Sequence, residues 1–367
     1  MAGTARTAAG TQGGQTAPQP LPDAAGTQQA ARPAPELLAW SRSAFDPALR
    51  AAAEALPAPI RQIAGYHFGW LDAQGRPTGA DGGKAIRPAL VLLAAEAVGA
   101  DPAAAVPAAV AVELVHDFSL LHDDVMDGDA TRRHRPTAWS VFGVGPAILA
   151  GDALLTLAFD VLAASGHPSA QDGMRMLSAA VQVLIDGQSS DMAFERRENV
   201  DLAQALGMAE NKTGALLGCA CALGALFGGG TAEQTALLRG FGERLGLSFQ
   251  LVDDLLGIWG DRAATGKPVH SDLRNRKKSL PVVAALTSGT PAGAELAGLY
   301  HREGALTEAE LARAAALVEL AGGRDWARRR AGELLDTALD RLGSVGPHAR
   351  PAAELAELAR LVVRRDH

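Results

Sequence analysis

Long stretches rich in alanine and leucine follow one another from residue 37 almost to the end of the sequence. Examples are "PALVLLAAEAVGA", "GDALLTLAFDVLAAS" and "GMRMLSAAVQVLIDGQSSDMAF". Several of them end at Gly or Pro, as helices do, and none alternates polar and apolar residues as a half-buried strand would. Aromatic residues make up only 4% of the chain, so the core must consist of Ala, Leu and Val, a mixture that favours helices. We therefore predict one large all-α domain over residues 37–367 and no β-sheet.

The first 36 residues have a different composition, with Ala, Gly, Thr, Gln and Pro and almost no large apolar side chains. Such a segment cannot bury enough surface to offset the entropy that ordering costs. We expect residues 1–36 to be a disordered low-complexity tail, which is either solvated or docks onto a partner. Within the helical domain, the expected loops are residues 72–83, 128–137, 260–275 and 343–351.

Charge and hydropathy exclude several classes of protein. The net charge of -7 argues against general nucleic-acid binding, which needs a basic surface. The N-terminus lacks the apolar core of a signal peptide. The longest uncharged run, residues 213–232, reaches bilayer length but contains six glycines, so we interpret it as a buried helix and expect no transmembrane segment. Cys219 and Cys221 would point in different directions on that helix, which disfavours a disulfide or a metal pair and fits the cytosol.

Residues 120–136, "LLHDDVMDGDATRRHRP", crowd four aspartates into seven positions. On a helix Asp123 and Asp127 share a face, with Asp124 beside them and His116 close to the same face. Converging carboxylates need a cation, and Mg²⁺ prefers one or two carboxylates with waters and substrate phosphates. The alternative is a solvated acidic helix end, but the preceding residues are apolar and suggest burial.

Arginines follow the acidic cluster, and a second acidic pair lies on a later helix. Arg132 and Arg133 carry guanidinium groups, which bind phosphate oxygens in a fork geometry. The segment "FQLVDDLLGIWGD" places Gln250, Asp253 and Asp254 in an otherwise apolar helix. If the two acidic helices face each other, they would hold a metal–diphosphate cluster between them. The simpler alternative is that Asp253 and Asp254 belong to one buried ion pair whose charges are compensated within the protein. Further candidate basic and polar residues are Lys84, Arg87, Lys212, Thr213, Lys267 and Lys277.

These segments resemble those of the trans-isoprenyl diphosphate synthases. The patterns "GGKxxRP", "HDxxxLxHDDxxDxxxxRR", "KT", "FQxxDD" and "GKPxxxDLxxxKKSLP" occur in the family's order and cover most of residues 37–365. The resemblance implies an all-α isoprenoid synthase fold, in which long helices surround a central cavity. It also implies a Mg²⁺-dependent head-to-tail condensation of isopentenyl diphosphate with an allylic diphosphate.

The resemblance assigns roles to individual residues. The metal ligands would be Asp123, Asp124, Asp127, Asp253 and Asp254, holding about three Mg²⁺ ions. Isopentenyl diphosphate would be bound by Lys84, Arg87, His116 and Arg133. The allylic diphosphate would be bound by Arg132, Lys212, Lys267 and Lys277, with Thr213 and Gln250 lining the reaction zone. The catalytic set among these would be Asp123, Asp124, Asp127, Lys212, Thr213, Gln250, Asp253 and Lys267.

One position departs from the family pattern: Gly257 replaces the third aspartate of the second motif, and Asp261 stands four residues further on. One metal ligand is then absent or acts through water. Two alternatives therefore stay open. A class I terpene cyclase shares the fold and the first motif, although it would not need "GGKAIRP". A catalytically degenerate synthase subunit, or a packaged cargo protein, would explain Gly257 and the long tail.

The resemblance also bears on product length and partners. An aromatic residue at Phe118 followed by a small residue at Ser119 resembles synthases that stop at geranylgeranyl diphosphate, with farnesyl diphosphate as the next candidate; Phe118 as ordinary core is the alternative. Helix periodicity alone places Ser119 beneath Asp123 and would make Ser119 the wall of the cavity. The family implies a cytoplasmic homodimer. An actinobacterial subgroup further suggests that the tail directs the protein into an encapsulin nanocompartment.

Overall fold

The computed structural model describes residues 1–4, 31–79, 83–261 and 269–363. Residues 31–367 form one compact unit, and its first helix begins at Ala34. Most of the predicted disordered tail lies outside the described residues, and so does Lys267. The tail therefore remains a prediction.

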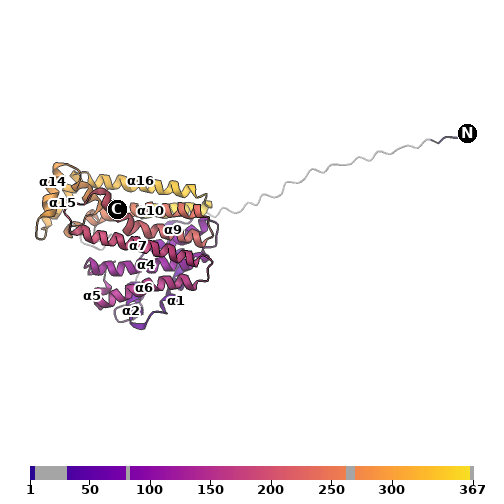
Figure 1. The fold of residues 1–367 in the computed structure, drawn as a ribbon, viewed down its shortest axis with the longest axis horizontal. Helices are drawn as coiled ribbons and strands as arrows, with labels where there is room; N and C mark the ends of the chain where they lie inside the picture. Colours follow the sequence, from indigo (N-terminus) through magenta and orange to yellow (C-terminus); the bar gives the residue numbers. More distant parts are fainter. Residues whose placement is uncertain (5–30, 80–82, 262–268, 364–367) are drawn as a thin grey trace. The chain divides into compact units, whose positions relative to one another are not determined.

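The domain is built of helices, as predicted (Figure 1). In chain order they are α1 (Ala34–Ala53), α2 (Ala58–His67), α3 (Ile86–Ala97), η1 (Pro102–Ala105), α4 (Val106–Met126), α5 (Ala138–Phe142), α6 (Val144–Ala164), α7 (Ala170–Glu195), α8 (Leu202–Ala209), η2 (Glu210–Gly214), α9 (Ala215–Phe227), α10 (Ala232–Trp259), α12 (Ser271–Arg274), α13 (Leu280–Leu286), α14 (Pro291–His301), α15 (Glu308–Leu320), α16 (Gly323–Ser344) and α17 (Ala349–Val363). The long helices α16, α10, α9, α7, α4 and α6 run roughly along one direction in Figure 1, while α14 and α15 form one end of the domain.

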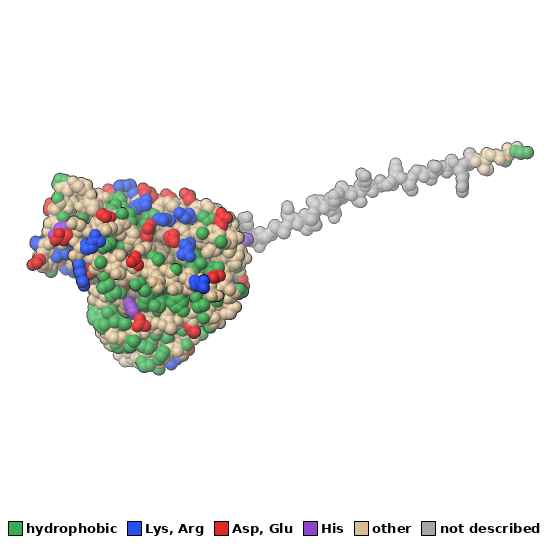
Figure 2. Space-filling view, in the orientation of Figure 1, with side chains coloured by type: hydrophobic (Ala, Val, Ile, Leu, Met, Phe, Trp, Pro, Cys, Tyr) green, Lys and Arg blue, Asp and Glu red, His purple; other side chains and the backbone are tan. Residues whose placement is uncertain are grey.

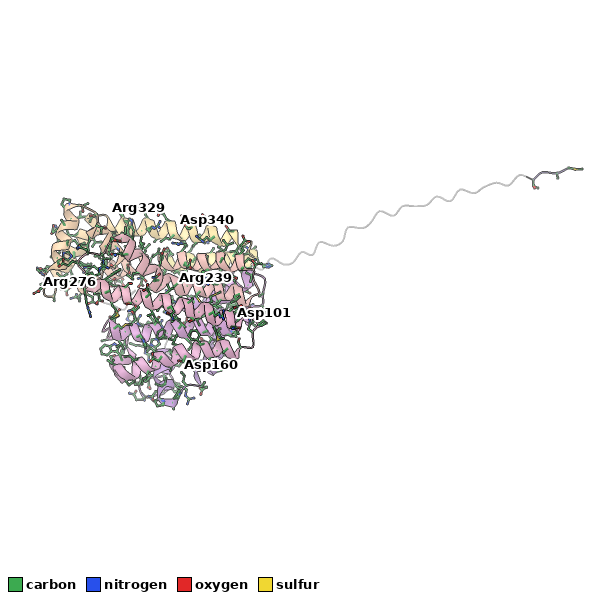
Figure 3. All side chains as sticks on the ribbon, in the orientation of Figure 1. Asp101, Asp160, Arg239, Arg276, Arg329 and Asp340 are labelled. Atoms are coloured by element: carbon green, nitrogen blue, oxygen red, sulfur yellow. The ribbon has the colours of Figure 1, made fainter. Side chains whose placement is uncertain are left out.

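Local sequence signals explain where several helices begin. Thr231 and Gln234 form a capping box at the start of α10, because each side chain accepts a hydrogen bond from the other's backbone N–H. Asp201 and Gln204 do the same for α8. Charged side chains such as Arg329 and Asp340 lie on the outer side of α16 (Figure 3). The buried residues of α16 are small or apolar, such as Ala327, Ala331, Leu334, Ala338 and Leu342, so this helix turns its apolar side inward.

The centre of the bundle depends on small residues where helices cross. A Cβ atom at Gly224 of α9 would collide with the carbonyl oxygen of Val91 on α3 and lie 2.8 Å from the Cβ of Ala94. Almost all of α9 is buried, which confirms the interpretation of the uncharged run as a buried helix. Cys219 and Cys221 are buried free thiols on this helix.

A short hairpin corrects the prediction that the chain has no sheet. Strand β1 (Thr131–Arg132) pairs antiparallel with β2 (Arg135–Pro136), within the predicted loop 128–137. The two residues between the strands, Arg133 and His134, have φ of 50° and 61°, as a tight two-residue turn requires. Strands of two residues are too short to show the alternation by which a strand is recognised in a sequence.

A buried ionic network joins the segment before α1 to the last helix. The Arg32 guanidinium donates to both carboxylate oxygens of Glu354 at 2.8 and 2.7 Å, and to Glu96 at 3.1 Å. Arg350 donates to the same two carboxylates at 3.2 and 2.6 Å. Glu354 is fully buried, and the two arginines compensate the charge of its carboxylate. The Arg32 guanidinium also lies 3.9 Å above the Trp40 ring.

Two helical segments, Pro102–Met126 and Val144–Ala164, are long and apolar enough to cross a membrane by length and composition. Core helices pass the same test, and the absence of a transmembrane segment remains a prediction. Helix α6 and the adjacent α7 leave an apolar face exposed, made by Val144, Ile148, Leu149, Val183, Ile185 and Met192. Figure 2 shows apolar side chains gathered over the region of α6.

Candidate active site

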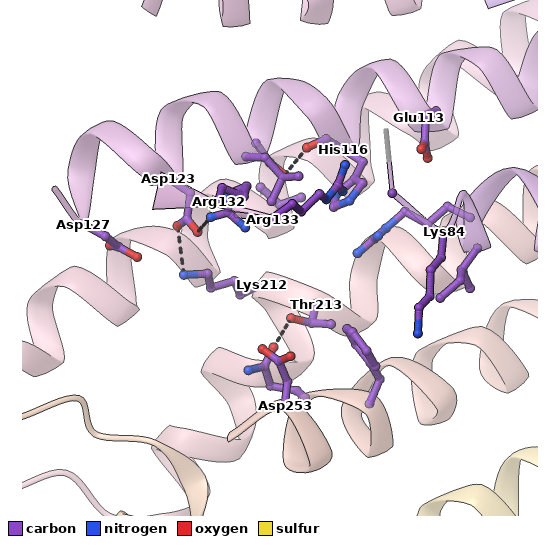
Figure 4. Close-up of a pocket in the computed structure, with 18 of the residues that line it drawn as sticks. Lys84, Glu113, His116, Asp123, Asp127, Arg132, Arg133, Lys212, Thr213 and Asp253 are labelled. Carbon is purple, nitrogen blue, oxygen red and sulfur yellow. Dashed lines mark hydrogen bonds and ion pairs between the residues drawn. The ribbon is translucent and has the colours of Figure 1, made fainter. Parts of the chain in front are cut away.

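A cavity of about 800 Å³ opens between the helices and collects most of the predicted site residues (Figure 4). Its walls come from the start of α3, one face of α4, the β1–β2 hairpin, α7, η2, α10 and the segment after α12. The predicted residues that line it are Lys84, Arg87, His116, Ser119, Asp123, Asp127, Arg132, Arg133, Lys212, Thr213, Gln250, Asp253 and Lys277. Phe118, Asp124 and Asp254 do not line it, and Lys267 lies outside the described residues.

Three carboxylates face the cavity from two helices. Asp123 and Asp127 lie one turn apart at the end of α4, and Asp253 lies across from them on α10 (Figure 4). Burial and the nearby charge of Asp123 raise the pKa of Asp127 to about 6. Burial would also raise the pKa of Asp123, but Lys212 and Arg132 more than offset it, so the pKa of Asp123 is lowered. The site therefore holds Asp123 ionised and leaves Asp127 without full charge compensation.

The second aspartate of each pair is buried behind the wall. Asp124 is 2% exposed and accepts a 2.6 Å hydrogen bond from Arg132 Nε. Asp254 accepts from the Gln250 side chain and from the backbone N–H of Leu280, both at 2.8 Å. Burial raises the pKa of Asp254 to about 7. Of the predicted metal ligands, Asp123, Asp127 and Asp253 line the cavity, whereas Asp124 and Asp254 lie behind its wall and accept hydrogen bonds from Arg132, Gln250 and the Leu280 backbone.

Lys212 bridges two carboxylates at the centre of the site. It lies in η2, a π-helical turn, and its Nζ is 2.6 Å from Asp191 and 3.1 Å from Asp123. Burial alone would lower the pKa of Lys212, but these carboxylates raise it. A Cβ atom at Gly187 would lie 2.7 Å from the Cα of Lys212, so only glycine lets α7 and η2 approach this closely.

A chain of hydrogen bonds links the reaction zone to the buried carboxylate of Asp254. The Thr213 hydroxyl donates to Gln250 Oε1 at 2.6 Å, and Gln250 Nε2 donates to Asp254. This chain fixes which end of the Gln250 amide is turned toward Thr213. Thr213 and Gln250 thereby present oriented oxygen dipoles to the cavity.

Basic side chains and one neutral histidine gather at the other end of the cavity. Lys84, Arg87 and Arg133 line this end with His116. Burial and the charges of Arg87 and Arg133 lower the pKa of His116, so its ring stays neutral near pH 7. Burial and Asp117 raise the pKa of Glu113 to about 8, which keeps that side chain mostly protonated there.

The apolar part of the cavity contains Ser119 and not Phe118. Ser119, Leu120, Leu184 and Phe249 line it, as helix periodicity predicted for Ser119. Phe118 is 6% exposed and packs edge-on against His122, with ring centroids 4.8 Å apart.

Sequence reasoning missed several residues of the site. Asp191 and Gln188 on α7 and Glu113 on α4 received no role, although Gln188 and Glu113 line the cavity and Asp191 binds Lys212. The signal was "DGQSSD", where polar residues interrupt an apolar helix. The Gln188 Nε2 atom is buried and makes no hydrogen bond to protein, so it is available for a ligand.

The carboxylates fit Mg²⁺. Among the described residues, no three metal-ligating side chains converge on one point. The acidic residues instead lie on two facing walls of a polar cavity. Lysine and arginine side chains line the same cavity. Mg²⁺ uses one or two protein carboxylates and completes its octahedral shell with water and phosphate oxygens, so this donor set suits an ion shared with a diphosphate.

Comparison with known proteins gives consistent results. The family model described as polyprenyl synthetase matches residues 70–318. The chain is 48% identical to the (2E,6E)-farnesyl diphosphate synthase of Mycobacterium tuberculosis over 332 residues, 90% of this chain and 92% of that protein. It is 47% identical to the geranylgeranyl diphosphate synthase of the same organism, over 90% of this chain and 93% of that protein. The crystal structure of a polyprenyl synthetase from Streptomyces coelicolor A3(2) superimposes with a TM-score of 0.86 at 49% identity, covering 90% and 99% of the two chains.

Proposed function

The chain belongs to the polyprenyl synthetase family and is a prenyltransferase with the all-α isoprenyl synthase fold, and from this premise we propose that it elongates an allylic diphosphate with isopentenyl diphosphate in a Mg²⁺-dependent reaction. The observation that carries the proposal is the cavity itself. Carboxylates from α4 and α10 face each other across it, and cationic side chains surround them on both sides. Such a site can neutralise diphosphate groups, and it also has an apolar part, lined by Ser119, Leu120, Leu184 and Phe249.

One group of residues in the cavity acts on the allylic diphosphate. Asp123, Asp127 and Asp253 would hold about three Mg²⁺ ions, which neutralise the diphosphate that leaves the allylic substrate. Lys212 and Lys277 bind oxygens of that leaving group. Their fixed positive charges stabilise the negative charge that develops as the C–O bond breaks.

The remaining residues bind isopentenyl diphosphate and stabilise the allylic cation. Lys84, Arg87 and Arg133 bind isopentenyl diphosphate, and the neutral His116 ring contributes a hydrogen bond. The double bond of isopentenyl diphosphate attacks the cation, and the released diphosphate takes the proton that is lost. The oxygens of Thr213 and Gln250 stabilise the cation. Apolar side chains exclude water, which would otherwise capture the cation.

One assay tests the proposal against its alternatives. The protein is incubated with Mg²⁺, labelled isopentenyl diphosphate and allylic primers of increasing length, and the products are extracted. Longer prenyl diphosphates support a synthase, cyclic hydrocarbons would indicate a class I terpene cyclase, and no product would indicate a non-catalytic subunit. Asp123→Ala should lower kcat at least about a hundredfold without unfolding the protein, because it removes charge stabilisation needed in the transition state. Asp340→Ala, an exposed aspartate on α16, is the matched control and should be unchanged.

For the product, we propose geranylgeranyl diphosphate first and farnesyl diphosphate second. The support is the small side chain of Ser119 in the apolar part of the cavity, which leaves room below Asp123. Relatives of nearly equal identity carry both names, so overall similarity does not decide between them.

We also propose that the protein is a homodimer that joins through the apolar face of α6 and α7. An exposed surface of this kind is costly in a monomer. Leu149, a member of this face, is 59% exposed, and Leu149→Glu should shift the mass measured by light scattering from dimer to monomer. Leu320→Glu, at a 68% exposed leucine on α15, is the control and should leave the mass unchanged. A monomeric wild type would contradict the proposal.

For the tail, we propose that it directs this cytoplasmic enzyme into an encapsulin shell. The support is its composition, which is low in charge and rich in Pro, Gly and Ala. The deletion should end at residue 30, because Arg32 belongs to the folded domain. The shortened protein should keep its catalytic rate and no longer co-purify with a shell protein. If the full-length and the shortened protein co-purify with the shell equally well, the proposal is refuted.

A further inference from the structure

The β1–β2 hairpin carries two arginines of the site, Arg132 and Arg133, which both reach the cavity (Figure 4). The hairpin has only two residue pairs, and one of them sets Arg132 directly opposite Arg135. A two-stranded hairpin is at best marginally stable in water, and like charges opposite each other destabilise it further. Contacts with the rest of the domain therefore hold the hairpin, and with it Arg133, in place.

The two opposed arginines contact different partners. Arg132 Nε donates to the Asp124 carboxylate on α4 at 2.6 Å, which fixes the first strand. Arg135 donates to backbone carbonyls instead, from Nη1 to Tyr66 and from Nη2 to Leu71, both at 3.2 Å. Its guanidinium carbon also lies 4.5 Å from the centre of the Tyr66 ring, in a cation–π contact. The second strand is thus fixed to the end of α2 and to the turn that follows it.

Tyr66 of α2 binds the second strand in return. Its hydroxyl donates to the Pro136 carbonyl at 2.8 Å, while its own carbonyl accepts from Arg135. Tyr66 is 6% exposed, and its ring packs edge-on against Phe142 with the ring centroids 5.3 Å apart. Because burial fixes Tyr66, its reciprocal contacts with the second strand also fix the hairpin relative to α2.

Arg133, in the turn of the hairpin, packs against the segment that carries Lys84. A Cβ atom at Gly83 would collide with the Arg133 guanidinium, and Gly83 has a φ of 107°, which favours glycine. Gly83 therefore lets the Arg133 guanidinium lie against the backbone next to Lys84. Leu71, whose carbonyl Arg135 binds, belongs to the same connection between α2 and α3. The spacing of the two basic side chains thus depends on where the hairpin lies.

We propose that Arg135 is a positioning residue: its contacts with α2 and the following turn dock the hairpin and thereby orient Arg133 for the diphosphate of isopentenyl diphosphate. Arg135 acts through its shape, because a planar guanidinium reaches two carbonyls and a ring at once, whereas a lysine ammonium of equal charge does not. Arg132 keeps its own carboxylate partner, so the allylic site changes little when the contact is lost. The inference rests on the proposed function in assigning isopentenyl diphosphate to Arg133.

The test measures the binding of isopentenyl diphosphate and of geranyl diphosphate by calorimetry, each alone and in the same Mg²⁺ buffer, so that no elongation occurs. Arg135→Lys keeps the charge and loses the bridge. It should weaken binding of isopentenyl diphosphate about tenfold and that of geranyl diphosphate less than about twofold. Tyr66→Phe, which removes the hydrogen bond to Pro136, should weaken isopentenyl diphosphate binding about threefold. In an Arg133→Ala background, Arg135→Lys should have no further effect.

The matched control is Arg76→Lys in the turn after α2, where the Arg76 side chain is 74% exposed and pairs with Asp72. It should leave both affinities unchanged. The proposal is refuted if folded Arg135→Lys binds isopentenyl diphosphate like the wild type, or if it weakens the binding of both substrates equally. Should Arg135→Lys fail to fold, wild-type binding by Tyr66→Phe refutes the proposal by itself. A wild type that binds isopentenyl diphosphate but does not elongate an allylic primer would contradict the proposed function and leave this inference standing.

Discussion

Asp191→Asn is the substitution that best tests how the site holds its central lysine. Asp191 is 8% exposed and accepts a 2.6 Å hydrogen bond from Lys212, whose other carboxylate, Asp123, lies 3.1 Å away. Hydrogen bonds to charged groups contribute about 1.5–3 kcal/mol, and breaking a buried ion pair completely costs about 3–5 kcal/mol. In the variant, residue 191 still offers a side-chain acceptor oxygen, and Lys212 still has the Asp123 carboxylate as a partner. We therefore expect the free energy of unfolding to fall by an amount in the lower range, about 2 kcal/mol.

The same substitution should also affect the metal site. Without the charge of Asp191, Lys212 pairs with Asp123 alone and competes more strongly with Mg²⁺ for that carboxylate. The Mg²⁺ concentration that gives half-maximal prenyl transfer should therefore rise several-fold. Urea unfolding and a Mg²⁺ titration of the rate measure the two effects separately.

A matched control lies on the same helix. Asp186 of α7 is exposed and accepts a 3.0 Å hydrogen bond from Asn211, the neighbour of Lys212. Asp186→Asn should change the free energy of unfolding by less than about 0.5 kcal/mol and leave the Mg²⁺ requirement unchanged. If Asp191→Asn behaves like Asp186→Asn in both measurements, the bridge through Lys212 does not organise the site.

Three further predictions concern other parts of the structure. Ser119→Phe should shorten the main product from geranylgeranyl to farnesyl diphosphate, whereas Phe118→Ala, which changes a residue outside the cavity, should alter it less; unchanged products from both folded variants would remove the basis for the product assignment. Burial and Asp117 raise the pKa of Glu113 from 4.5 to about 8, so the stability gained by holding this proton is complete below pH 4.5 and is lost as the pH rises toward about 8. Thermal unfolding in Mg²⁺-free buffer should therefore show Glu113→Gln gaining stability relative to the wild type between about pH 5 and 8, and a constant difference would contradict the shift. Gly224→Ala should lower the free energy of unfolding by about 1–3 kcal/mol, because α3 and α9 must separate, and an unchanged urea midpoint would show that the crossing tolerates a methyl group.

The fold class and much of the site were predictable because they depend on local spacing. A helix period places Asp123 and Asp127 on one face, and both carboxylates line the cavity. The same period correctly placed Ser119 in the wall. Capping residues and glycines likewise mark the ends of helices through interactions that span only a few residues.

The remaining features depend on contacts between distant segments. Sequence spacing shows that Asp124 lies next to Asp123, but only the hairpin shows that Arg132 draws its carboxylate away from the cavity. Asp191 reaches the site because Gly187 lets η2 come close to α7, and no spacing within α7 contains that information. The Asp272 carboxylate lies beside Gly257 although it is fifteen residues further along the chain, and no spacing within α10 indicates that contact.

The ionic network around Glu354 also sets the order in which the domain can be completed during synthesis. Arg32 and its fully buried partner are 322 residues apart, so at usual rates of translation roughly 16 to 64 s separate their appearance. Throughout that time Arg32 has no Glu354 to bind, and the sides of α3, α10 and α16 that α17 contacts are not yet covered by it. The contact between Arg32 and Glu354 therefore forms only after α17 has been synthesised, however early the helices before it fold.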